Sequence, residues 1–314
     1  MLDNIGFYTL SDSRACTTSV TSPLKRCELI LTDSCNFNCP YCRGLKPDIS
    51  GTKTLKEAKN IVDKWEGLEN IRFSGGEPTI WPGLLELVKY TKCKRIAIST
   101  NGTADFDFYQ ELIDRGVNDF SISLDSCCSS MSKTMSGTKQ TFFDKIVSNI
   151  KKLSKLTYVT VGVVLNENNL SEVLEIINLS DSLGVSDIRV IPSAQYDKFE
   201  NINIDSVLLN RYPILKYRIN HKRHVRGLKK TDCGKCRLVL DDMAVAGNYH
   251  FPCIIYMREQ GNPIGTMDKS IIEIRQERSK WMERHDSHKD TICCNNCLDV
   301  CIDFNNTVED FQNT

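Results

Sequence analysis

Short apolar segments rich in β-branched residues alternate with longer amphipathic segments between residues 27 and 192. The short segments have the length of strands, and the longer ones carry an apolar face with helical spacing, as in 55–65 and 143–153. Repeated strand–helix units with right-handed crossovers build a parallel sheet. Six units suffice for an open barrel but not for a closed eight-stranded one, so we expect an α/β fold with a partial (β/α)6 TIM-like barrel. The expected strands are 27–31, 70–74, 95–99, 119–124, 158–165 and 187–191.

Each unusual motif of this region follows the C-terminal end of an expected strand. The motifs are Cys35 to Cys42, Ser74-Gly75-Gly76-Glu77-Pro78, Ser99-Thr100-Asn101-Gly102 and Ser123-Leu124-Asp125-Ser126. Parallel α/β folds bind their ligands at the C-terminal ends of the strands. The sequence therefore predicts that these motifs form one site.

Three cysteines, Cys35, Cys39 and Cys42, lie within eight residues. Their thiolates could hold three irons of a 4Fe-4S cluster, and the loop has no fourth cysteine for the remaining iron. The alternative, a structural zinc site, requires a fourth Cys or His ligand. None lies nearby in the sequence, so we expect a cluster with one open iron.

The Cys-x3-Cys-x2-Cys loop followed by Gly-Gly-Glu resembles the radical S-adenosylmethionine (SAM) superfamily. This resemblance implies that Cys35, Cys39 and Cys42 hold the catalytic cluster, whose open iron binds the amino and carboxylate groups of SAM. It places Tyr41 near the adenine of SAM. It also implies that a reduced cluster cleaves SAM to methionine and a 5′-deoxyadenosyl radical, which removes a hydrogen from the substrate. An electron donor such as flavodoxin or ferredoxin would be a partner.

The same resemblance assigns further cofactor contacts. The segment Ser74, Gly75, Gly76 and Glu77 would hold the methionine amino end, because close backbone approach needs glycine and an ammonium needs an acceptor. The remaining candidates are polar residues at other strand ends: Thr100, Asn101 and Ser123 for the carboxylate or ribose, and Asn166 near the adenine. For these four, ordinary strand-end capping is the alternative.

A second group of cysteines follows residue 232: Cys233, Cys236, Cys253, Cys293, Cys294, Cys297 and Cys301. The stretch 237–240, a turn at Gly247-Asn248 and the stretch 249–252 predict a hairpin that brings Cys236 near Cys253. A helix over 271–284, opened by a capping box at Ser270 and Glu273, would return the chain to the last cysteines. We expect an auxiliary iron-sulfur cluster, with zinc as the alternative, and the predicted ligands are Cys233, Cys236, Cys253, Cys294, Cys297 and Cys301.

This cysteine-rich tail resembles the twitch/SPASM auxiliary-cluster domain, and the chain from about Leu24 is similar to the molybdopterin-pathway GTP cyclase group. The stretches 121–126, 135–137 and 143–145 also look cyclase-like. However, the Gly-Arg-Arg tail of the cyclases and the full Cys-x2-Cys-x5-Cys-x3-Cys pattern of two-cluster SPASM domains are both missing. The resemblance therefore implies at least one auxiliary 4Fe-4S cluster, with one favoured over two.

The domain boundaries follow from these patterns. We expect an N-terminal extension over 1–23, the barrel over 24–200, a basic linker over 201–232 and the small C-terminal cysteine-rich domain over 233–314. The basic run 221–230 is interpreted as a solvated face of the linker, with contact to an anionic substrate as the alternative.

Charge and composition limit the partners. Lys plus Arg and Asp plus Glu both total 40, which argues against a nucleic-acid partner and against an anionic membrane surface. The N-terminus lacks the features of a signal peptide, and 15 cysteines, an odd number in two clusters, fit metal chemistry in a reducing compartment. We therefore expect a cytoplasmic protein.

The leading hypothesis is a radical SAM enzyme that modifies a peptide, as in RiPP-type maturases, or a protein. The short extension before the barrel suggests that a separate protein would bind a leader peptide. The alternatives are a radical SAM enzyme for a nucleotide or other small molecule, cyclase- or dehydrogenase-like, and a non-catalytic iron-sulfur or zinc protein.

Cys127 and Cys128 follow the fourth strand and are interpreted as packing residues, with hydrogen-atom return to the substrate as the alternative.

Overall fold

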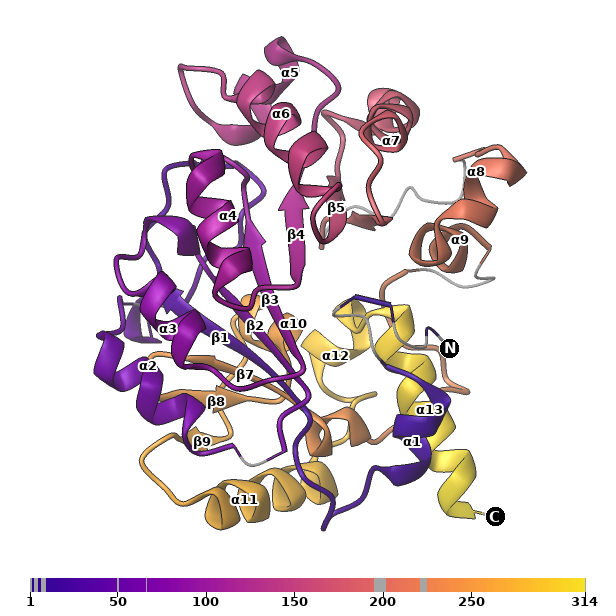
Figure 1. The fold of residues 1–314 in the computed structure, drawn as a ribbon. Coiled ribbons are helices and arrows are strands. Elements are labelled where there is room, and N and C mark those ends of the chain that lie inside the picture. Colours follow the sequence, from indigo (N-terminus) through magenta and orange to yellow (C-terminus); the bar gives the residue numbers. More distant parts are fainter. Residues whose placement is uncertain are drawn as a thin grey trace.

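The computed structural model describes residues 2, 5–6, 10–49, 51–65, 67–194, 202–220 and 225–313. Its centre is a parallel sheet in the strand order β6-β5-β4-β3-β2-β1, which confirms the expected α/β fold (Figure 1). Every predicted strand is present within one or two residues of its expected bounds. The strands are β1 (Arg26–Thr32), β2 (Asn70–Gly75), β3 (Arg95–Thr100), β4 (Asp119–Ser123), β5 (Tyr158–Leu165) and β6 (Asp187–Pro192).

Helices from the crossovers cover the sheet. In Figure 1, α2 (Leu55–Val62), α3 (Leu84–Tyr90) and α4 (Phe106–Asp114) lie along one side of the sheet, followed by α6 (Phe143–Leu153) and α7 (Val173–Ser182). The capping box of Thr54 and Glu57 starts α2, which ends before Trp65. Helix α6 buries Ile146, Ile150 and Leu153 at helical spacing.

The sheet continues past β1 into the C-terminal part. Strand β7 (Asp242–Ala246) pairs in parallel with β1, and β8 (Tyr249–Phe251) and β9 (Gly265–Thr266) extend it in antiparallel fashion. The predicted hairpin exists, but its first arm is β7, whereas 237–240 forms a short 3-10 helix, η5 (Arg237–Leu240). Leu238, Val239 and Leu240 are all buried, and three consecutive buried side chains suit a helical turn better than one face of a strand.

Four helices complete the C-terminal part: α10 (Ile254–Arg258), α11 (Ile271–Arg284), α12 (Thr291–Asn296) and α13 (Asp299–Asn313). Helix α11 has the predicted bounds and the predicted capping box. The short N-terminal helix α1 (Asp12–Thr17) lies beside the C-terminal helix α13 (Figure 1). Arg14 of α1 forms a buried ion pair with Asp241, which immediately precedes β7.

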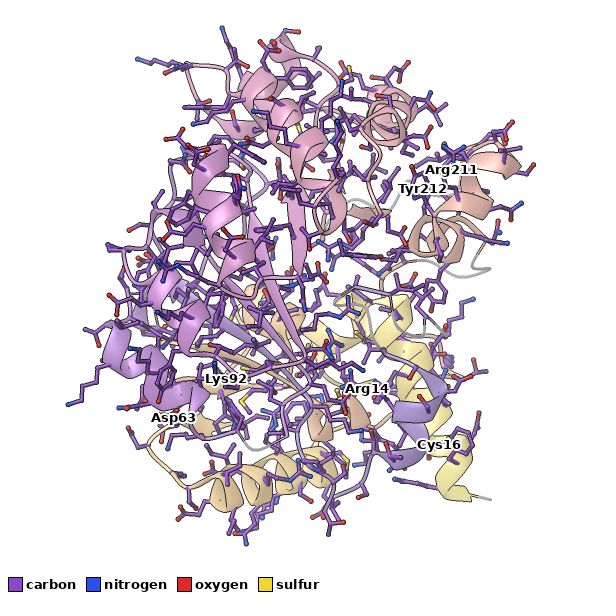
Figure 2. The ribbon with its side chains drawn as sticks, viewed as in Figure 1. Arg14, Cys16, Asp63, Lys92, Arg211 and Tyr212 are labelled. Carbon is purple, nitrogen blue, oxygen red and sulfur yellow. The ribbon has the colours of Figure 1, made fainter. Side chains whose placement is uncertain are left out.

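The segment predicted as a linker contains two helices, α8 (Ser206–Arg211) and α9 (Pro213–Asn220). Helix α9 packs on β6, and the backbone N–H of Ile214 donates to the buried carboxylate of Asp187. Figure 2 labels Arg211 and Tyr212, which both bond to Asp181 of α7. The first part of the basic run, 221–224, and the stretch 195–201 lie outside the described residues. Within the described ranges, no helix is both long and apolar enough to cross a membrane.

Candidate active site

A cavity of about 360 Å³ opens at the C-terminal ends of the barrel strands. It gathers residues from all four strand-end motifs, as the sequence predicted. Among the predicted site residues, those that line it are Cys35, Cys39, Tyr41, Cys42, Ser74, Gly75, Gly76, Glu77, Thr100, Asn101 and Ser123.

Hydrogen bonds to two other segments hold the cysteine loop in place. The Asn38 N–H donates to the carbonyl of Ser136 over 2.9 Å, at the end of α5 (Ser129–Ser136). The Asn36 side chain accepts from the Asn101 amide at 2.7 Å and donates to the Thr103 hydroxyl at 2.8 Å. The loop is therefore fixed by polar contacts of its own backbone and side chains, which leaves the three thiols facing the cavity.

The loop thiols are unpaired and partly desolvated. All three are free cysteines. Burial raises the pKa of Cys39 to about 12, and burial also raises the pKa of Cys35. Binding of a metal requires thiolates, so filling this site would release protons.

The two glycines after β2 let the cysteine loop approach the strand end. A Cβ at Gly75, which has φ +156°, would lie 2.3 Å from the carbonyl oxygen of Thr32. A Cβ at Gly76 would lie 2.2 Å from the carbonyl oxygen of Ser34. Both distances are well below van der Waals contact, so only glycine fits between β2 and the backbone that leads into Cys35.

Glu77 is buried, with 1% of its surface exposed, and burial raises the pKa of its carboxyl. Its Oε1 accepts from the Thr79 N–H and hydroxyl and from the Thr100 hydroxyl, and its Oε2 accepts from the Asn101 N–H. A carboxylate has about four lone-pair positions, two on each oxygen. The four donors therefore match the four positions, and the carboxylate is satisfied within the protein.

Two of the polar candidates at the next strand ends, Thr100 and Asn101, form hydrogen bonds within the protein. Thr100 bonds to Glu77, and its hydroxyl accepts from the Gly102 N–H at 3.1 Å. The Asn101 side chain bonds to Asn36 and accepts from Thr103. These contacts fit the capping alternative, whereas Ser74 and Ser123 line the cavity with no side-chain hydrogen bond among the described residues.

Asn166 lies in an adjoining cavity of about 300 Å³ that Tyr41 and Cys42 also line. Its side chain is 3% exposed, and its Nδ2 has no hydrogen-bond partner among the described residues. A buried amide donor without a partner is costly unless a ligand accepts from it. The orphaned Nδ2 beside Tyr41 therefore fits a bound heterocycle such as an adenine.

Asp125 is a site residue that the sequence analysis quoted without assigning it a role. Its carboxylate accepts from the Tyr41 hydroxyl and from the Val164 N–H, so it ties the cysteine loop to β5. Burial raises the pKa of Asp125 to about 6. Its position two residues after Ser123, in the same strand-end motif, could have indicated that Asp125 belongs to the site.

A second, smaller cavity contains the C-terminal cysteines. Five of them line it: Cys236, Cys253, Cys293, Cys297 and Cys301. Burial raises the pKa of each of these five thiols. Two of the predicted ligands, Cys233 and Cys294, lie outside this lining, and the Cys233 thiol bonds to Glu309 instead. Cys293 was not in the predicted set, although the spacing of Cys293, Cys297 and Cys301, four residues each, was a signal for a shared helical face.

Helix α10 joins the two cavities. Cys253 caps its N-terminus, and Ile255 lines both cavities. At its C-terminal end, Arg258 donates to the carbonyl oxygens of Gly75 at 3.0 Å and Gly44 at 3.3 Å. The cysteine-rich part therefore contributes directly to the wall of the larger cavity.

Comparison with known proteins adds to this geometry. The sequence profile of the Radical SAM superfamily matches residues 29–180. These residues belong to the radical SAM superfamily. The match covers β1 to α7, including the cysteine loop and the Gly-Gly-Glu segment, and the family implies a 4Fe-4S cluster and SAM as cofactors.

Curated relatives of the radical SAM domain include a GTP 3′,8-cyclase from Clostridium perfringens, 29% identical over 57% of this chain and 59% of the relative. A probable GTP 3′,8-cyclase from Saccharolobus islandicus is 31% identical over 54% of this chain and 57% of the relative. The matches thus span less than two thirds of these relatives.

Solved structures share the fold over a longer range. Streptococcus suis SuiB, bound to its precursor peptide SuiA, is 14% identical with a TM-score of 0.59 over 81% of this chain and 65% of that chain. The anSMEcpe protein with bound AdoMet and the Cp18Cys peptide is 17% identical with a TM-score of 0.53 over 92% of this chain and 95% of that chain. The second match extends the similarity beyond the radical SAM domain.

Proposed function

We propose that the chain is an enzyme that reductively cleaves SAM and uses the resulting 5′-deoxyadenosyl radical to remove a hydrogen from its substrate. One observation carries this proposal: the thiols of Cys35, Cys39 and Cys42 line the same cavity as the Gly75–Glu77 segment. A cluster bound by three thiols keeps one iron open, and the adjoining strand ends offer acceptors and donors for an amino acid and an adenine.

The chain's own residues would bind and orient SAM. The Glu77 carboxylate, which lines the cavity, suits the methionine ammonium, and the orphaned Asn166 Nδ2 suits an acceptor nitrogen of the adenine. Asp125 would fix Tyr41 at the adenine side through its hydrogen bond. When bound, the cluster supplies the electron that cleaves SAM, and an electron donor such as flavodoxin or ferredoxin would reduce it.

An auxiliary 4Fe-4S cluster is proposed in the second cavity. Its ligands would come from Cys236, Cys253, Cys293, Cys297 and Cys301, since these thiols surround one apolar space. Four thiolates complete a 4Fe-4S cluster, so the cavity offers one more cysteine than a single cluster needs. Cys233 and Cys294, which lie outside the cavity lining, are left to other roles.

A peptide or protein substrate is the leading proposal. Both solved proteins described above hold a peptide in their structures, and the fold match to anSMEcpe spans nearly all of both chains. A separate leader-peptide-binding protein would be a partner if the substrate is a precursor peptide.

A nucleotide or other anionic small molecule is the second candidate. It is supported by the curated cyclase relatives and by three arginines, Arg43, Arg226 and Arg258, that line the larger cavity. Arg43 also pairs with the carboxylate of Glu259, which lines the same cavity. Guanidinium groups suit the phosphates of such a substrate.

The activity is tested by anaerobic reconstitution of the protein with iron and sulfide, followed by addition of dithionite and SAM. We expect 5′-deoxyadenosine from the wild type and from Cys16→Ser, and none from Cys39→Ser. Absence of 5′-deoxyadenosine from a wild type that has bound its full iron would overturn the proposal.

The substrate class is tested by deuterium transfer into 5′-deoxyadenosine. Transfer from GTP deuterated in its ribose favours the nucleotide candidate. The second probe is a deuterated peptide whose sequence comes from a short reading frame next to the gene for this protein. Deuterium transfer from that peptide, without transfer from GTP, favours the peptide candidate.

A further inference from the structure

A third group of metal-ligating side chains lies outside both cysteine cavities. It consists of Cys127 and Cys128, in the loop between β4 and α5, and Glu172, the last residue of the 3-10 helix η3 (Leu170–Glu172) after β5. One donor atom from each residue lies within 4.8 Å of the other two. None of the three residues lines the cavities described above.

The convergence of the two sulfurs is not what a plain packing role predicts. Cys128 has extended backbone, with φ −153° and ψ 168°. Successive side chains along an extended chain point to opposite sides. Here both sulfurs lie within 4.8 Å of one carboxylate oxygen instead, and all three side chains are half-buried, although Cys127 also packs against the main core.

A thiol proton now links two members of the group, and a cation could take its place. The Cys127 thiol donates to Glu172 Oε2 over 3.0 Å. The Cys128 Sγ forms a hydrogen bond with the Ser130 hydroxyl at 3.1 Å. A divalent cation would replace the thiol proton shared with Glu172 and stabilise three negative ligands at once.

We propose that Cys127, Cys128 and Glu172 bind a thiophilic divalent cation of the Zn²⁺ class. Two sulfur ligands and one carboxylate oxygen match the donor preferences of zinc, and three protein ligands leave the fourth tetrahedral position to water. Binding deprotonates both thiols and releases their protons to solvent, so affinity rises with pH. The inference is independent of radical chemistry, because it uses none of the residues assigned to SAM or to the clusters.

The test uses the full chain after anaerobic loading of its iron-sulfur clusters, so that the cluster cysteines are occupied. The protein is exposed to one equivalent of Zn²⁺ and desalted, and zinc and iron are measured by mass spectrometry. We expect one zinc per wild-type chain and less than a tenth of that in the double variant Cys127→Ser/Cys128→Ser, with unchanged iron. Glu172→Gln removes one charged ligand, so we expect its zinc affinity to fall at least tenfold.

Two single variants serve as matched controls. Cys16 is an exposed thiol on α1 beside α13 (Figure 2), and Cys93 is a half-buried thiol whose Sγ donates to the Leu68 carbonyl oxygen at 3.3 Å. Cys16→Ser and Cys93→Ser should keep the full zinc content. Equal zinc in the wild type and in the double variant would overturn the proposal, as would loss of zinc in either control.

Discussion

At the scale of single residues, the site depends on small contacts that sequence motifs predict only in outline. The sequence predicted that Gly75 and Gly76 allow close backbone approach to SAM, whereas the structure adds that both glycines are packed against the chain leading into the cysteine loop. It likewise predicted Asn101 as a ligand contact, but the Asn101 side chain bonds to Asn36 of that loop. Such contacts depend on how two loops pack against each other, and a single sequence does not specify that packing.

Gly76→Ala is predicted to displace the cysteine loop. Its φ lies outside the left-handed region, so the effect is steric: the new Cβ would sit 2.2 Å from the carbonyl oxygen of Ser34. Overpacking costs about 1–3 kcal/mol, so SAM affinity should fall by roughly ten- to a hundredfold. Titration of SAM into the cluster-loaded protein measures this. In the control Gly162→Ala, the new Cβ would meet only the end of the Arg189 side chain at 3.2 Å, and unchanged affinity is expected there. Equal losses in both variants would contradict the steric account.

Asp187 gives a pH prediction at the same scale. Burial raises the pKa of this carboxyl from its ordinary value of 3.8 to about 6, despite the N–H donors of Ile214 and Ile188. The folded state therefore holds the proton more tightly, so the contribution of Asp187 to stability is present in full below about pH 4 and is lost as pH rises to about 6. The loss is about 3 kcal/mol at most.

Urea unfolding between pH 5 and pH 7.5 tests this prediction. Asp187→Asn should flatten the fall in the free energy of unfolding over that range. An identical pH profile in the variant and the wild type would contradict the assignment.

At the scale of elements, the six barrel strands were predictable because each is a short apolar run bounded by turns, but the parallel pairing of β7 with β1 was not. That pairing joins strands more than 200 residues apart in the chain, and nothing local specifies it. Helix α12 explains why Cys293, and not Cys294, faces the second cavity: Cys293 and Cys297 are four residues apart and share a side, whereas Cys294 is turned away by one helical step.

Helix α10 leads to a prediction of its own. Because Arg258 holds the Gly75 carbonyl from the cysteine-rich part, Arg258→Met should weaken SAM binding without changing the iron content. Hydrogen bonds from a charged group contribute about 1.5–3 kcal/mol, so we expect roughly a ten- to hundredfold rise in the Kd for SAM. The control Arg211→Met removes a surface arginine of α8 that pairs with Asp181. If SAM affinity is the same in the Arg258 and Arg211 variants, α10 does not support the SAM site.

At the scale of the whole molecule, the barrel and the cysteine-rich part share one sheet and buried ion pairs, although the sequence suggested a linker between them. Arg218 of α9 and Asp299 of α13 form one such pair, in which both side chains are fully buried. The sequence analysis interpreted only the basic run 221–230, as a solvated face, and nothing local marks Arg218 as the partner of an aspartate 81 residues further along the chain. We therefore expect the two parts to unfold together.

Arg218→Met tests this cooperativity. It leaves the Asp299 carboxylate buried opposite an apolar side chain, which costs about 3–5 kcal/mol. Tryptophan fluorescence and circular dichroism should report one coincident transition in both proteins, shifted to lower urea in the variant. Two separate transitions, with only the cysteine-rich part affected, would contradict a single folding unit.

The central claim is that the cluster held by Cys35, Cys39 and Cys42 has an iron open to SAM. Electron paramagnetic resonance of the dithionite-reduced protein tests it most directly, in a variant whose five second-cavity cysteines are replaced by serine, so that only the first cluster is present. We predict that SAM shifts the g values of this signal. A reduced cluster whose spectrum is identical with and without saturating SAM would contradict the account.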